Sequence, residues 1–129
     1  MCRYYNCRYI NVCYNETVSK QYTQLSVCAF QILLALSLRP RHGYEIMQQI
    51  AEDTSGRIKI GPGSLYGVIG ELARDGLITG SDPDAVGRRK YYELTKKGKT
   101  TLGAELSNIE TVLQLGKKRM NSPLVSRCI

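Results

Sequence analysis

The first two helices are predicted from stretches in which apolar residues recur with the period of an α-helix. Residues 23–38, with a threonine suited to the N-cap at their start, are apolar almost all round and should be buried on most sides. Pro40 ends this helix, because proline has no backbone N–H with which to continue it. A second helix is predicted over 44–53, and Ser55 and Gly56 end it.

A third helix is delimited by a proline at its start and a glycine just past its end. Pro62 suits the first helical position, and Gly76 suits the residue after the last turn. Between them, apolar residues spaced four and three apart form a stripe that should face the core: Leu65, Ile69 and Leu72. The opposite face of this helix is predicted to be exposed and carries Gly63, Tyr66, Gly67, Gly70 and Arg74.

Two short strands are predicted to follow as an antiparallel hairpin. The first covers 77–79 and the second covers 90–94, while the connection over 80–89 is polar, contains Gly and Pro, and ends in basic residues. Side chains alternate between the two faces of a strand, and we assign Tyr92 to the core face. Tyr44, in the second helix, is also predicted to be a core residue.

A long C-terminal helix carries an apolar stripe that needs a partner. Thr95 suits its N-cap, and the helical pattern continues to about Met120. The apolar residues are spaced four, three and four apart, as in a coiled coil: Leu102, Leu106, Ile109 and Leu113. A lone helix cannot bury such a stripe against itself, so a second chain or the first helix must cover it. Dimerisation through this helix is the economical prediction.

The order of these elements predicts the fold class and the organisation of the chain. Three helices and a two-stranded hairpin, the wing, make a mainly α winged helix-turn-helix, which the C-terminal dimerisation helix follows. We therefore divide the chain into a winged-helix domain over 23–95, a dimerisation helix over 96–120 and a loose end over 121–129. Residues 1–22 lack a periodic apolar face and are predicted to form a poorly ordered tail.

The charge and hydropathy of the chain indicate the kind of partner and the compartment. The 129 residues include 18 Lys and Arg against 11 Asp and Glu, and the formal charge of +7 favours a polyanionic partner. The longest apolar run, over 27–38, is shorter than the roughly 20 residues that span a bilayer. Because no signal peptide is recognised either, we expect a cytoplasmic protein with no membrane partner.

The cysteine and histidine content predicts no metal site, no cofactor and no catalytic residue. Five cysteines form no C-x-x-C pair, and the one histidine, His42, is expected to be a structural turn residue. With no Gly-rich phosphate loop, an enzyme is not expected. The N-terminal tail contains Cys2, Cys7 and Cys13, and the alternatives to disorder there are a redox switch and an arm that lies on nucleic acid.

Motifs in a fixed order along the chain resemble the PadR family of transcriptional regulators. They are the segments 40–46 (PRHGYEI), 62–66 (PGSLY), 76–78 (GLI) and 87–95 (GRRKYYELT), followed by Gly98. The resemblance covers about 24–115. It implies a repressor that binds double-stranded DNA, and the predicted homodimer in turn implies a pseudo-palindromic operator. It also implies a small-molecule effector near the dimer interface, for which the sequence assigns no residues.

The start of the third helix is the first part of a candidate DNA surface. A helix N-terminus exposes unpaired N–H groups, so Gly63 and Ser64 can approach a phosphate closely, and Lys59 just before them can contact another. In the family that the chain resembles, the tyrosine at the position of Tyr66 is associated with DNA contact. The alternative is that Ser64 caps the helix and Tyr66 covers the wing.

Further along, glycines on the third helix and basic residues on the wing extend this candidate surface. Gly67 and Gly70 each cost about 1 kcal/mol in a helix interior relative to alanine. Close approach to the major-groove wall would explain both, and so would tight packing against the hairpin. Arg74 is the basic residue on this face. The wing adds three basic residues that either reach the minor groove and flanking phosphates or are only solvated: Arg88, Arg89 and Lys90.

A second class of function stays open beside DNA binding. A winged-helix domain can instead be an interaction module that binds another protein. Such a module would lack a continuous basic surface over the third helix and the wing, so the surface charge separates the two interpretations.

Overall fold

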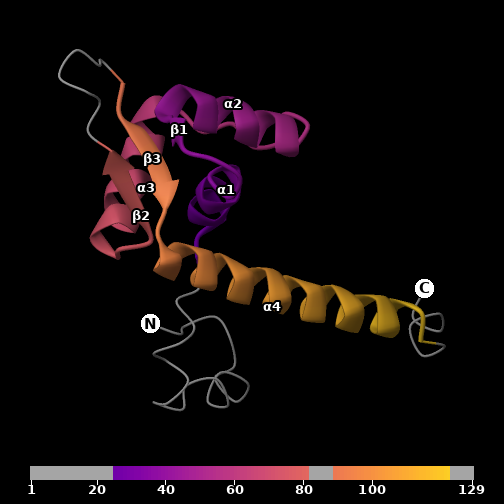
Figure 1. The fold of residues 1–129 in the computed structure, drawn as a ribbon. Helices are drawn as coiled ribbons and strands as arrows, with labels where there is room; N and C mark the ends of the chain where they lie inside the picture. Colours follow the sequence, from indigo (N-terminus) through magenta and orange to yellow (C-terminus); the bar gives the residue numbers. More distant parts are fainter. Residues whose placement is uncertain (1–24, 82–88, 123–129) are drawn as a thin grey trace, which may run out of the picture.

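The computed structural model describes residues 25–81 and 89–122, and its elements follow the predicted order apart from one additional short strand (Figure 1). Within these ranges the elements are α1 (Val27–Ala35), β1 (Arg41–His42), α2 (Gly43–Asp53), α3 (Pro62–Arg74), β2 (Ile78–Ser81), β3 (Tyr91–Leu94) and α4 (Lys96–Met120). The prediction of a mainly α winged helix followed by a long C-terminal helix is confirmed. The predicted tail over 1–22 and most of the predicted loose end lie outside the described residues.

The first helix is shorter at both ends than the sequence predicted. The predicted N-cap, Thr23, lies outside the described residues; instead, the Ser26 hydroxyl accepts a hydrogen bond of 3.1 Å from the Ala29 N–H. At the other end, α1 stops at Ala35 rather than at Leu38. The following segment leads into Pro40, and the residue before a proline is driven away from helical backbone angles.

Helices α2 and α3 end where their sequences predicted. After α2, Ser55 and Gly56 both have positive φ, at 51° and 76°, which no continuing helix can accommodate. After α3, Gly76 has φ 73°, and the Leu77 N–H reaches back to the Leu72 carbonyl at 2.9 Å. The apolar stripe of α3 is buried as predicted, with Leu65, Ile69 and Leu72 all in the core.

The sheet has three strands where the sequence predicted two. The strand order is β1-β3-β2, with β3 antiparallel to both neighbours. Tyr92 on β3 pairs with Gly80 of β2 and with Arg41 of β1. The added strand, β1, is only two residues long, and it buries an arginine whose Nε donates to the Ala35 carbonyl at 2.8 Å. A strand this short, with a charged residue on its buried side, shows no apolar alternation.

Helices α1, α2 and α3 pack against one another and enclose the core. The largest side chains without exposed area are Ile32, Leu33, Ile46, Ile50 and Leu65. Tyr92 is buried as predicted, but Tyr44 is exposed, so its assignment to the core was wrong. Ile46 and Ile50, four residues apart, form the buried side of α2 and turn Tyr44 toward solvent.

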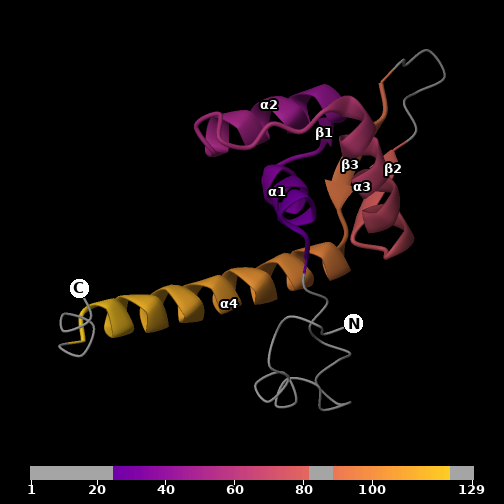
Figure 2. The ribbon, with the colours of Figure 1, turned by 180° about the vertical axis from the view of Figure 1, so that it is seen from behind.

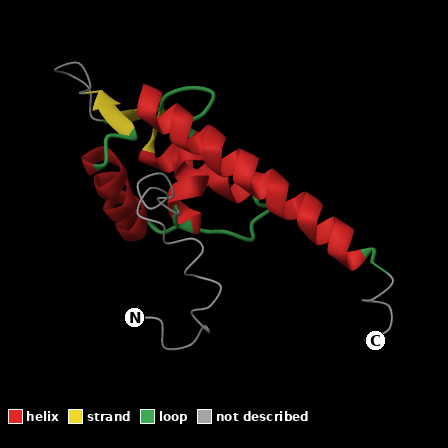
Figure 3. Ribbon diagram, turned by 90° about the horizontal axis from the view of Figure 1, so that it is seen from below, coloured by secondary structure: helices red, strands yellow, loops and turns green. Residues whose placement is uncertain are grey.

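The long helix α4 joins the core only at its start and then extends beyond the other elements (Figures 1 and 2). Figure 3 shows this projection from below. Thr95 is the N-cap as predicted: its hydroxyl accepts from the Gly98 N–H at 3.0 Å and donates to the Gly76 carbonyl at 2.6 Å. Lys97 Nζ also donates to the Asp75 carbonyl at 2.7 Å, which fixes α4 to the end of α3.

The predicted apolar stripe of α4 is divided between the core and the surface. Leu102 is 5% exposed and belongs to the core of its own chain. The other three stripe residues, Leu106, Ile109 and Leu113, are 43%, 45% and 54% exposed.

Among the described residues, no helix combines the length and the apolar character that crossing a bilayer requires.

Candidate nucleic-acid interface

The start of α3 presents two unpaired backbone donors on an exposed surface. The N-cap is Gly61, and no side chain caps the helix, so the alternative in which Ser64 serves as the cap is wrong. Pro62 has no N–H, and the Leu65 N–H donates to the Gly61 carbonyl at 2.9 Å. The N–H groups of Gly63 and Ser64 are therefore the two that this helix end leaves for a ligand.

Three glycines leave one stripe of the exposed face of α3 without side chains over two turns, beside Tyr66. A Cβ built on Gly63, Gly67 or Gly70 would meet no described atom within 4 Å. Tight packing against the described part of the hairpin therefore does not explain these glycines. They leave a strip of backbone that another molecule can approach closely.

Tyr66 lies on this face and leans toward the start of α2. Its side chain is 53% exposed, and its hydroxyl oxygen would lie 2.7 Å from a Cβ built on Gly43. Gly43 is therefore the residue that lets the phenol rest against α2. Tyr66 therefore contacts the start of α2 and does not only cover the wing.

A pocket of about 270 Å³ opens beside Tyr66, between α2 and the wing. It is lined by residues of α2 and its cap, of α3, and of β3 and the segment before it: His42, Gly43, Tyr44, Tyr66, Arg89, Lys90 and Tyr92. The sequence did not predict this pocket, because its walls lie up to about fifty residues apart along the chain and are joined by the unpredicted β1–β3 pairing.

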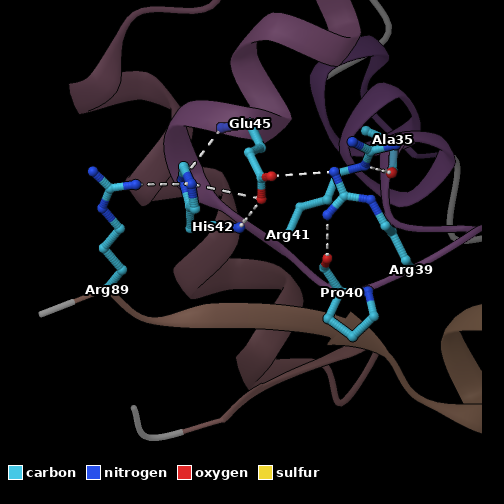
Figure 4. A network of polar contacts seen from close by, with 7 residues as sticks. All are labelled: Ala35, Arg39, Pro40, Arg41, His42, Glu45 and Arg89. Atoms are coloured by element: carbon cyan, nitrogen blue, oxygen red, sulfur yellow. Dashed lines mark hydrogen bonds and ion pairs between the residues drawn. The ribbon is translucent and has the colours of Figure 1, made fainter. Parts of the chain in front are cut away.

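His42 connects the start of α2 with the wing (Figure 4). Its Nδ1 accepts from the Glu45 N–H at 3.4 Å, and the Glu45 carboxylate accepts from the His42 N–H at 3.2 Å, so the two residues form a capping box. On the other side of the ring, Nε2 lies 3.4 Å from Nη1 of Arg89. The expected structural turn residue is thus a helix cap that also holds a wing arginine.

Glu45, the acidic residue of this network, also pairs with Arg39. A hydrogen bond of 3.1 Å from Arg39 lowers the pKa of Glu45 below its ordinary value, which keeps the carboxylate ionised and turned toward Arg39. Burial raises the pKa of Tyr92, and the neighbouring Tyr66 raises it further. The Tyr92 phenol therefore stays protonated at neutral pH.

The predicted basic residues are distributed unevenly around the face of α3. Arg89 and Lys90 are exposed at the wing, and Lys90 Nζ lies 6.0 Å from the centre of the Tyr92 ring. Arg88 lies outside the described residues. Lys59 is exposed before α3, and Arg74 is in the last helical turn, where a cation also offsets the helix dipole. Arg74 is about 12 Å along the axis from Tyr66 and so belongs to the other end of the face.

A winged helix with a bare helix face and cations on its wing has the form of a nucleic-acid-binding domain, and comparison with known sequences supports this class. Residues 32–104, more than half of the chain, match the PadR-like family of transcriptional regulators, and the protein belongs to this family. An uncharacterised protein of Lysinibacillus sphaericus is 33% identical over 90 residues, which cover 65% of this chain and 83% of that protein.

Solved structures of other family members share the fold. A PadR family transcription regulator from Clostridium difficile R20291 is 24% identical, with a TM-score of 0.64 over 74% of this chain and 100% of that chain. Bacillus subtilis PadR, solved in complex with operator DNA, is 26% identical, with a TM-score of 0.54. That match covers 62% of this chain and 46% of the Bacillus chain.

Proposed function

We propose that this protein is a cytoplasmic transcriptional repressor that binds double-stranded DNA sequence-specifically, as a homodimer on a pseudo-palindromic operator. The observation that carries the proposal is the bare face of α3, where Gly63, Gly67 and Gly70 leave the backbone accessible next to Tyr66. A major groove about 12 Å wide admits an α-helix, and the glycine stripe beside Tyr66 lets the helix backbone sit deep in it.

The ends of this face supply contacts to the DNA backbone. The N–H groups of Gly63 and Ser64 point outward from the positive end of the helix dipole, where a phosphate is favoured. On the wing, Arg89 and Lys90 are exposed, and Arg88 precedes them in the sequence. Lys59 and Arg74 flank the helix at its two ends. The complex of Bacillus subtilis PadR with operator DNA supports the same use of the fold here.

The three exposed residues of the α4 stripe support the homodimer. Leu106, Ile109 and Leu113 form an uncovered row on a helix that extends past its own domain. We expect the equivalent helix of a second copy to cover this row in such a way that the two α3 helices lie on one side of the dimer. DNA half-sites about 34 Å apart, one helical turn, would match them and give a pseudo-palindromic operator.

The proposal is tested by removing wing charge and measuring how affinity depends on salt. Changing Arg88 and Arg89 together to Ala should weaken binding to every duplex and lower the slope of log affinity against log salt by about 0.9 for each lost phosphate contact. The matched control changes Lys117 and Lys118 to Ala, which removes the same charge from the far end of α4. This control should keep the wild-type slope.

A second variant separates base recognition from backbone contact. Tyr66→Ala should reduce discrimination between operator and random duplex by roughly 1 to 3 kcal/mol if the phenol touches base edges. Fluorescence anisotropy at two salt concentrations measures both effects. A wild-type protein that binds no duplex from its own promoter region, even at low salt, would contradict DNA binding and favour a protein-interaction module.

A further inference from the structure

We propose that the pocket between α2, α3 and the wing binds one phosphodiester group of the DNA backbone, with the Tyr44 hydroxyl as a donor and Arg89 and Lys90 as the cations. This inference rests on the proposed function and deepens it. It assigns a role to Tyr44 and to the His42 cap, neither of which the sequence placed in the DNA surface.

The pocket adjoins the face of α3 that is proposed to enter the groove. Tyr66 forms one of its walls, and Gly63 and Gly70 lie three residues before and four residues after Tyr66 on the same side of the helix. A duplex laid along this face therefore has the pocket at its side, and we infer that one sugar-phosphate strand passes over the mouth of the pocket. Tyr44 and Tyr66 are more than half exposed, so a polymer can reach the site from solvent.

The lining has the charge that a phosphate requires. Two of the seven lining residues, Arg89 and Lys90, are cationic, and none carries a carboxylate. The nearest acid, Glu45, has one carboxylate oxygen 3.1 Å from Arg39 and the other 3.2 Å from the His42 N–H. The second oxygen also lies 3.6 Å from His42 Nε2, so the Glu45 charge is shared between Arg39 and His42, while both cations of the lining remain.

The donors of the pocket are held in place while remaining free to bind. The His42 ring contacts Arg89 at 3.4 Å, which draws the guanidinium over the pocket and leaves its other N–H groups available. The same ring stacks on Tyr44, with centroids 6.4 Å apart and planes 17° from parallel. Within the described residues, the hydroxyls of Tyr44, Tyr66 and Tyr92 make no hydrogen bond to the protein. The free oxygens of a phosphodiester accept from groups of this kind.

Removal of a single hydroxyl tests the assignment. Tyr44→Phe keeps the ring and its stacking on His42 but removes the donor, and should weaken binding to a random-sequence 30-base-pair duplex about tenfold, the loss expected for one hydrogen bond to a charged group. Because no charge is removed, the slope of log affinity against log salt should stay at the wild-type value. Lys90→Ala should instead lower that slope by about 0.9.

Tyr91→Phe is the matched control. Tyr91 touches the edge of the same His42 ring, with centroids 5.6 Å apart, but does not line the pocket. It should bind the duplex like the wild type, and all three variants should keep the wild-type melting temperature. A random duplex suffices for these measurements, because contacts to phosphate carry no sequence information.

The outcomes separate this inference from the proposed function. If the wild type binds the duplex and Tyr44→Phe matches Tyr91→Phe, the pocket is overturned while DNA binding stands. If the wild type binds no duplex, both are overturned. An NMR titration of labelled tyrosine rings with inorganic phosphate shows whether the bound phosphate group belongs to DNA or to a free anion. If the protein binds no DNA but phosphate shifts a signal that Tyr44→Phe abolishes, the pocket is a site for a free anion.

Discussion

Some helical glycines of the described chain are closely packed and others face open space, a difference that the sequence does not reveal. A Cβ on Gly98 would collide with the carbonyl oxygen of Leu77, so this glycine allows α4 to pack on the end of α3. A Cβ on Gly43 would press on the Tyr66 hydroxyl. By contrast, Gly67 and Gly70 face empty space within the described residues. The first two serve the fold, and we attribute the other two to binding.

Stability and DNA affinity should therefore change in opposite directions when Gly70 is replaced. Gly70→Ala should raise the free energy of unfolding by up to about 1 kcal/mol, because alanine is the better helix former and its Cβ meets no described atom. The same methyl group should weaken duplex binding by holding α3 away from the groove. Thermal unfolding and fluorescence anisotropy measure the two effects.

Gly103→Ala on α4 is the control for this prediction. A Cβ at Gly103 also meets no described atom within 4 Å, so the substitution should stabilise the helix similarly without changing affinity. Equal DNA binding by Gly70→Ala and the wild type would show that the bare face of α3 has another cause.

At the scale of single elements, α4 has two functions along its length. Its first turns belong to the domain: the Thr95 hydroxyl caps the helix by accepting from the Gly98 N–H and also donates to the Gly76 carbonyl. Lys97 donates to the Asp75 carbonyl, and Leu102 is buried in the core. Beyond these turns the helix leaves the domain with its apolar row exposed. Burying that row removes apolar area from water, which is the main driving force for association.

Charges placed in the exposed row should separate the subunits. Leu106→Asp with Ile109→Asp should give monomers in sedimentation at tens of micromolar, whereas the wild type should sediment as a dimer. Both side chains are nearly half exposed in the single chain, so the fold itself should tolerate the change. DNA affinity should fall as well, because two monomers would then bind the two half-sites of one operator independently.

Two aspartates on the outer side of the same helix provide the control. Ser107→Asp with Thr111→Asp adds the same charge at exposed positions off the row and should leave the dimer intact. A wild-type protein that is monomeric at these concentrations would refute dimerisation through α4.

For the whole molecule, the core begins close to the start of the described chain. Ala29 is its first fully buried member, Leu25 packs partly against it, and Ser26 caps α1. Residues 1–22 lie outside the described part of the chain. The predicted division at residue 23 stays a prediction, which truncation tests.

Removal of residues 1–22 should leave both the melting temperature and the duplex affinity close to those of the full chain. Removal of residues 1–26 is the comparison, because it also takes away Leu25 and the Ser26 cap, and loss of such a cap costs about 1 kcal/mol. A drop of several degrees, or loss of most of the binding, in the shorter truncation would show that the N-terminal segment contributes to the fold or to the DNA surface.

The sequence by itself determined the order and most boundaries of the elements, because these depend on local signals. Pro62 and Gly76 delimit α3 through the backbone angles that proline and glycine favour, and Thr95 caps α4 with its own hydroxyl. The period of the apolar residues identified the buried side of α3. The ordered motifs also indicated the family, which the match over 32–104 confirmed.

Only the tertiary structure decided which surfaces meet. The pairing of β1 with β3 joins His42 to Tyr91 across about fifty residues, and no local pattern marks a two-residue strand. That pairing brings Arg89 to His42 and creates the pocket that Tyr44 lines. Tertiary packing also decided that Leu102 is buried while the rest of its stripe is exposed. Spacing along a helix fixes the side on which a residue lies but not what covers that side.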